Sequence, residues 1–307
     1  MHRRFPAPTR LSSPKSWCGN IPAHLVQGAS ISADKVIIMK IENISEPLIN
    51  REVYNLYQSE PIQNLRNGFI ALINRHEVPY AENILKTNDW VNYLYYCSLV
   101  RTIAPDPSAL IIDWGGLYGH ITKILQTMGY EKTFNYLLHQ TPHYPFFEEK
   151  LKIPTLWGRD PNQLSLDSNS VDVFISSGVL EHVREDGIGQ EETILREIHR
   201  VLKEGSLFFI WNLPAKLGTS EILAGITGKW HHQYRYWKKE ILTLLENSNF
   251  EILYSDKHKF FPGAAMNLLE RWIAPTNLLN FDNHLSHLFP FNLLARDFVL
   301  VTRKKKI

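Results

Sequence analysis

The stretch Asp113-Trp114-Gly115-Gly116-Leu117-Tyr118-Gly119 separates a short apolar run, Ala109 to Asp113, from an amphipathic run, His120 to Met128. The first run predicts a buried strand and the second a helix. Glycines at such a junction let the backbone pass close to a ligand, and the helix N-terminus offers free N–H donors. The spacing G-G-x-x-G differs from the G-x-G-x-x-G of dinucleotide-binding turns. Taken alone, the stretch indicates either a ligand-binding turn or a tight turn that binds nothing.

The chain beyond this turn continues to alternate between strand and helix patterns. Apolar runs at 133–138, 171–176 and 206–212 predict strands, and Glu191 to Lys203 has the periodicity of an amphipathic helix. Strands that alternate with helices favour parallel βαβ units. We therefore expect an α/β fold with a doubly wound, Rossmann-like sheet.

The segment before residue 106 differs from this α/β part. Residues 1–38 are rich in Arg, Ser and Pro and have no acid before Asp34, which predicts a disordered tail, a targeting segment, or sequence upstream of a true start at Met39. Residues 39–105 have helical periodicity and predict a helical N-terminal cover. The α/β domain then spans 106–307, with substrate insertions expected at about 213–240 and 262–290.

Composition excludes several classes of function. Lys plus Arg is 33 and Asp plus Glu is 31, so the net charge of +2 does not favour nucleic-acid binding by charge alone. Cys18 and Cys97 cannot form a disulfide framework or a cysteine zinc site. No apolar run reaches the roughly 18 residues that a membrane span requires. These features predict a soluble, cytoplasmic protein; its oligomeric state is left open.

Four segments in order resemble the class I S-adenosylmethionine-dependent methyltransferases, in particular the small-molecule methyltransferases of type 11. The Asp-Gly-Gly turn is the first, and the other three are Trp157 to Leu166, Ser170 to Val183, which contains Leu180-Glu181-His182, and Leu195 to Gly205. The resemblance implies a seven-stranded sheet whose last two strands, near 250–254 and 298–302, form an antiparallel edge hairpin. It also implies S-adenosyl-L-methionine as the cofactor.

The resemblance assigns cofactor-binding roles to a set of residues. Asp113 would pair with the ammonium of the cofactor, and Asp160 would accept a hydrogen bond from its adenine. The remaining residues implied at the cofactor are Gly115, Gly116, Gly119, Ser177 and Gly178. The sequence departs from the family at Leu117, where a glycine is common, and at Leu138-His139-Gln140, where an acid usually holds the ribose. His139 or Gln140 could form that contact without a charge.

The acceptor side of the site is predicted from residues after the fourth and fifth strands. His182 is the candidate general base, with Glu181 beside it, or it is a structural histidine. Aromatic residues near Arg235 suit a ring or an acidic group, or else form a packing cluster; they are Trp230, Tyr234 and Trp237. We expect no metal site, since no further ligands can be placed and His231 and His232 are adjacent.

The resulting hypothesis is methyl transfer to a small-molecule acceptor such as a sugar, a lipid-linked compound or a secondary metabolite. The alternative is a catalytically weak or inactive protein of the same fold that acts as a binding or regulatory module. Leu117 and the missing acid after the second strand favour the alternative. A dehydrogenase is a more distant possibility. A nucleic-acid substrate is not expected, because Ser177 to His182 lacks the Asn/Asp-Pro-Pro-aromatic motif of base-modifying members.

Overall fold

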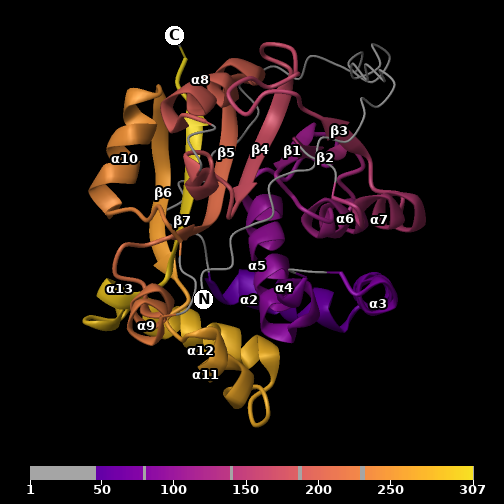
Figure 1. Cartoon of the computed structure of the whole chain (residues 1–307), viewed down its shortest axis with the longest axis vertical. Helices are drawn as coiled ribbons and strands as arrows, with labels where there is room; N and C mark the ends of the chain where they lie inside the picture. The colour runs from indigo at the N-terminus through magenta and orange to yellow at the C-terminus, as the bar shows by residue number, and fades with distance from the viewer. Residues whose placement is uncertain (1–45, 79–80, 139–140, 186–188, 229–231, 307) are drawn as a thin grey trace.

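The computed structural model describes residues 46–78, 81–138, 141–185, 189–228 and 232–306 (Figure 1). The predicted tail at 1–38 lies outside these ranges, as do His139, Gln140, Trp230 and His231. No helix within the described ranges is both long and apolar enough to cross a membrane.

The described strands form one seven-stranded sheet with the order β3-β2-β1-β4-β5-β7-β6. All neighbours from β3 to β5 are parallel, whereas β7 is antiparallel to both β5 and β6. The predicted Rossmann-like fold with an antiparallel edge hairpin is therefore confirmed. The strands are β1 (Ile111–Trp114), β2 (Thr133–Leu137), β3 (Thr155–Trp157), β4 (Val171–Ser177), β5 (Leu202–Pro214), β6 (Phe250–His258) and β7 (Asp297–Lys304).

One face of the sheet packs against the N-terminal helices and the two helices that follow β1 and β2. Alternate strand residues, such as Ile111, Val173 and Phe209, share a buried cluster with these helices. Within α5, burial is continuous from Trp90 to Val100, as the nearly uniform apolar pattern of this stretch predicts. The helices are α2 (Glu46–Gln58), α3 (Glu60–His76), α4 (Glu82–Leu85), α5 (Thr87–Ile103), α6 (His120–Thr127) and α7 (Tyr144–Leu151).

The opposite face packs against α8 (Glu191–Val201) and α10 (Lys238–Asn247) through the intervening strand residues, including Ile112 and Phe208. The sequence pattern extends α8 to Lys203, but in the structure β5 begins at Leu202. The reason is that Leu202 pairs with Val171 of β4, which draws the end of the helical pattern into the sheet.

Four further helices gather below the sheet in Figure 1, at the end where β5 finishes. They belong to the segments that follow β5 and β6. Because parallel strands end at one edge of a sheet, residues after β1, β4 and β5 meet at this edge. The helices are α9 (Thr219–Thr227), α11 (Gly263–Leu269), α12 (Pro275–His287) and α13 (Phe291–Leu294).

Candidate functional site

The glycine turn after β1 is shaped by contacts within the protein. Gly115 and Gly119 have φ angles of 66° and 73°, the left-handed region in which glycine is favoured. A Cβ atom on Gly115 would lie 2.7 Å from a methyl group of Val179. Leu117 also has a positive φ, 48°, and its side chain is partly exposed. The leucine is accommodated because its side chain turns toward solvent.

Asp113 at the end of β1 is fully buried. Its Oδ2 accepts hydrogen bonds from the Thr122 backbone N–H at 3.1 Å and from the Thr122 hydroxyl at 2.8 Å. Its Oδ1 accepts no hydrogen bond from any described residue. Burial raises the pKa of Asp113 to about 6, although the two bonds from Thr122 oppose the rise. A buried carboxylate oxygen without a donor suits a cationic ligand group, which is what the cofactor's ammonium would provide.

A series of polar contacts joins the end of β4 to β5 and β7. Ser177 ends β4, and its hydroxyl accepts a hydrogen bond of 2.9 Å from Asn212 Nδ2. Lys259 donates to Asn212 Oδ1 at 2.5 Å and forms an ion pair of 3.3 Å with Asp297. Gly178, next to Ser177, has a φ of 64°. The sequence predicts Ser177 and Gly178 as part of the site but not Asn212, Lys259 and Asp297, which come from three different segments.

Asp160 lies in the loop after β3 and is exposed. Its Oδ1 accepts a hydrogen bond of 2.7 Å from the Asn162 backbone N–H. The predicted ribose contact, His139, falls outside the described residues. The adenine role of Asp160 stays a prediction.

Glu181 and His182 lie in the short helix η3 (Leu180–His182) that follows β4. Glu181 is 1% exposed, and neither of its carboxylate oxygens forms a hydrogen bond with a described residue. Burial raises its pKa to about 8. His182 is partly exposed, and its Nδ1 lies 2.9 Å from Glu185 Oε2, so its Nε2 points toward Glu181, 3.9 Å from Oε1.

His232 joins this pair from the segment between α9 and α10. Its Nε2 lies 4.0 Å from Glu181 Oε1, and its Nδ1 lies 2.7 Å from Glu221 Oε1 of α9. Burial lowers the pKa of His232, but the bond to Glu221 and the charges of Glu181 and Glu221 raise it by more. The sequence does not predict a metal role for His232, because it is adjacent to His231. In the structure its partners Glu181 and Glu221 lie 51 and 11 residues away along the chain.

The predicted acceptor-binding residues lie around the same segment. The Arg184 guanidinium lies 5.5 Å from the centre of the Tyr234 ring. Arg235 lowers the pKa of Glu221 by its charge, after the larger effects of burial and of His232. Trp237 precedes α10 and is half exposed. The charge of Arg235 therefore acts on the carboxylate of the Glu221–His232 pair.

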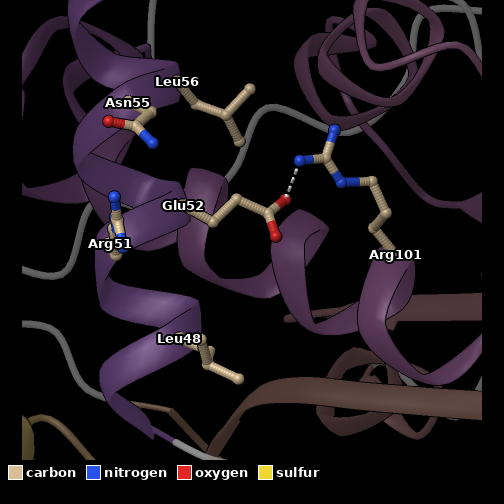
Figure 2. Close-up of a pocket in the computed structure, with 6 residues that line it drawn as sticks. All are labelled: Leu48, Arg51, Glu52, Asn55, Leu56 and Arg101. Atoms are coloured by element: carbon tan, nitrogen blue, oxygen red, sulfur yellow. Dashed lines mark ion pairs between the residues drawn. The ribbon is translucent and has the colours of Figure 1, made fainter.

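A shallow hollow lies elsewhere, between α2 and the last turn of α5 (Figure 2). Figure 2 shows Glu52 and Arg101 pointing toward one another, and their ion pair measures 2.8 Å. The last turn of α5 leads into the start of β1, whereas the glycine turn follows its end. The hollow is therefore not part of the candidate site.

Comparison with protein families gives a match over residues 113–210 to a family described as "Methyltransferase domain". This confirms the resemblance to class I S-adenosylmethionine-dependent methyltransferases, and it implies S-adenosylmethionine as the cofactor. The matched stretch runs from Asp113 to Ile210 and so contains the glycine turn, β4 and η3. The comparison with curated proteins gives no significant match.

Solved structures with a similar fold include S-adenosylmethionine-dependent methyltransferases from two organisms. The one from Thermotoga maritima is 15% identical, with a TM-score of 0.49, and the alignment covers 77% of this chain and 99% of that one. The one from Archaeoglobus fulgidus is 12% identical, with a TM-score of 0.47, and the alignment covers 69% of this chain and 94% of that one.

Proposed function

We propose that the protein transfers the methyl group of S-adenosylmethionine to a small-molecule acceptor. The observation that carries this proposal is the family match over 113–210, which places the glycine turn and η3 in one methyltransferase domain. Methyl transfer from a sulfonium needs alignment more than acid–base chemistry, because the positive sulfur already activates the methyl carbon.

The cofactor would lie along the ends of β1 and β4. Asp113 Oδ1, which has no donor among the described residues, would accept a hydrogen bond from its ammonium. The backbone at Gly115, Gly116 and Gly119 would pass beside its amino-acid end, with Ser177 and Gly178 on the side of β4. Asp160 would bind the adenine, and His139 would bind the ribose.

The acceptor would bind on the side of η3. His182 has its Nδ1 held by Glu185, so its Nε2 is the basic atom directed toward the space beside Glu181. We assign Glu181 and His182 to activation of the acceptor, because a hydroxyl acceptor must lose its proton for transfer to be completed. Arg235, Tyr234, Trp237 and Trp230 would hold the acceptor.

A second candidate function is a binding or regulatory module of the same fold. Val179 packs directly against Gly115, which narrows the approach to the glycine turn from the side of β4. Isothermal titration of the full chain with S-adenosylmethionine, followed by labelled-methyl transfer in a cell extract, separates the two. Binding with transfer supports the enzyme, whereas binding without transfer to any acceptor supports the module.

A further inference from the structure

Two histidines and one glutamate converge after β4, in the space beside η3. One ligand atom from each of Glu181, His182 and His232 lies within 4.8 Å of the others. The two imidazole Nε2 atoms lie 3.9 Å and 4.0 Å from the same oxygen, Glu181 Oε1. Two nitrogens and one oxygen from three side chains make up a ligand set that is common for catalytic zinc.

The geometry is close to that of a bound ion. Bonds of about 2.0–2.1 Å in a tetrahedral arrangement separate neighbouring ligand atoms by about 3.4 Å. The two nitrogen-to-oxygen separations exceed this value by about half an ångström, and the two nitrogens lie within 4.8 Å of one another. Rotation of the three side chains toward a common point would shorten these separations.

Each histidine is oriented by its own carboxylate. Glu185 contacts His182 Nδ1 at 2.9 Å, and Glu221 contacts His232 Nδ1 at 2.7 Å. This arrangement directs both Nε2 atoms inward and is the usual second layer of contacts around metal-binding histidines. The Glu221 carboxylate also accepts a hydrogen bond of 3.1 Å from the His232 backbone N–H, which fixes its position.

Glu181 provides an independent indication of a ligand. Its side chain is 1% exposed, and its oxygens accept no hydrogen bond from the described residues. A buried carboxyl without donors is costly unless a cation or a proton satisfies it.

A second cluster, formed by Asp256, His258 and His287, is also compact enough to be considered. There His287 Nε2 contacts Asp256 Oδ2 directly at 2.9 Å, and the Tyr254 hydroxyl donates to the same oxygen at 3.3 Å. The carboxylate oxygen is therefore already occupied by groups of the protein. This second cluster serves as a control.

We propose that Glu181, His182 and His232 bind a divalent transition-metal ion such as Zn²⁺, with a fourth position open to an oxygen of water or of the acceptor. A bound ion lowers the pKa of a coordinated hydroxyl or water. In the loaded protein, an acceptor hydroxyl bound at the fourth position would lose its proton to solvent more readily, and the ion would take the place of a free His182 as the activating group. Only this last role depends on the proposed methyl transfer; the metal site does not.

The test is titration of the metal-stripped full chain with Co²⁺ in the absence of cofactor. We expect one ion per chain and the strong visible absorption of four-coordinate Co²⁺, which Zn²⁺ should displace. His232→Ala and Glu181→Gln should abolish this absorption. Glu221→Gln should weaken binding by about 10–100-fold, since it removes the negative charge of the carboxylate that orients His232 and leaves the three proposed ligands in place.

His287→Ala, in the second cluster, is the matched control and should bind Co²⁺ as the wild type does. Circular dichroism of each metal-free variant establishes that it is folded. Glu221→Gln leaves all three proposed ligands in place, so weaker binding by this variant cannot result from the loss of a ligand. The proposal is overturned if the wild type binds no Co²⁺, if His232→Ala and Glu181→Gln bind normally, or if His287→Ala alone removes the signal. Titration with S-adenosylmethionine tests the methyltransferase function separately. Failure of the metal-site proposal can therefore be distinguished from failure of the proposed function.

Discussion

Replacement of Asp113 by Asn should stabilise the protein without ligand and weaken its binding of the cofactor. The carboxyl is fully buried, and among the described residues its only hydrogen-bond donors are the two groups of Thr122, both bound to one oxygen. An asparagine can keep those bonds through its own oxygen. It removes the buried negative charge that the ammonium of the cofactor is proposed to pair with.

The magnitude follows from the pKa of Asp113, which burial raises from 3.8 to about 6. At 1.36 kcal/mol for each pKa unit, this rise corresponds to about 3 kcal/mol. The folded protein holds the proton more tightly than the unfolded chain, so this group's contribution to stability is lost as the pH rises from about 4 to about 6. At neutral pH, Asp113→Asn should therefore have a free energy of unfolding up to about 3 kcal/mol higher than the wild type.

Urea denaturation at pH 4.5 and at pH 7.5, with and without S-adenosylmethionine, measures both effects. The advantage of the variant should be larger at pH 7.5, and its stabilisation by the cofactor should be smaller than that of the wild type. Asp172→Asn is the control, because Asp172 is partly exposed and pairs with Lys203 at 2.7 Å; it should give no gain. The reasoning is refuted if Asp113→Asn is less stable than the wild type at pH 7.5 or binds the cofactor equally well.

Three further variants test the turn and the acceptor side. Gly115→Ala should lower the free energy of unfolding by about 1–3 kcal/mol, because of the positive φ and the 2.7 Å approach to Val179. Adding Val179→Ala to Gly115→Ala should recover the part of that loss which the contact causes. A Gly115→Ala variant as stable as the wild type would contradict the prediction. His182→Ala should lower kcat by about 10²–10⁴-fold and leave cofactor affinity unchanged in a titration; normal turnover would make the histidine structural. Arg235→Ala should mainly raise KM in steady-state kinetics, and an unchanged KM with a lower kcat would exclude a role in binding the acceptor.

The fold could be predicted because its signals are local in the sequence. The apolar run before Asp113, the glycine turn and the amphipathic run after it specify β1 and α6 without information from elsewhere. The bounds of β5 could not be predicted, because Leu202 joins the strand through its pairing with Val171. The short strand β3 has too few residues to give a periodic pattern.

The candidate site could be predicted only in part, because contacts between distant segments bring some of its residues together. Glu181 and His182 stand together in the sequence directly after a predicted strand, and the sequence predicts both as site residues. Glu221 and His232 come from the segment after β5. The position of this segment beside η3 depends on tertiary packing, and no local sequence pattern indicates it. The burial of Asp113 and its contact with Thr122 likewise depend on the packing of α6 against β1 and β2.

Calorimetric titration of the purified full chain with S-adenosylmethionine, with NADH as the comparison, tests the central claim most directly. We predict saturable binding of S-adenosylmethionine at one site and none of NADH. At 100 times the dissociation constant, the cofactor should raise the free energy of unfolding by about 2.7 kcal/mol. The absence of S-adenosylmethionine binding at millimolar concentration would contradict the proposed methyltransferase function.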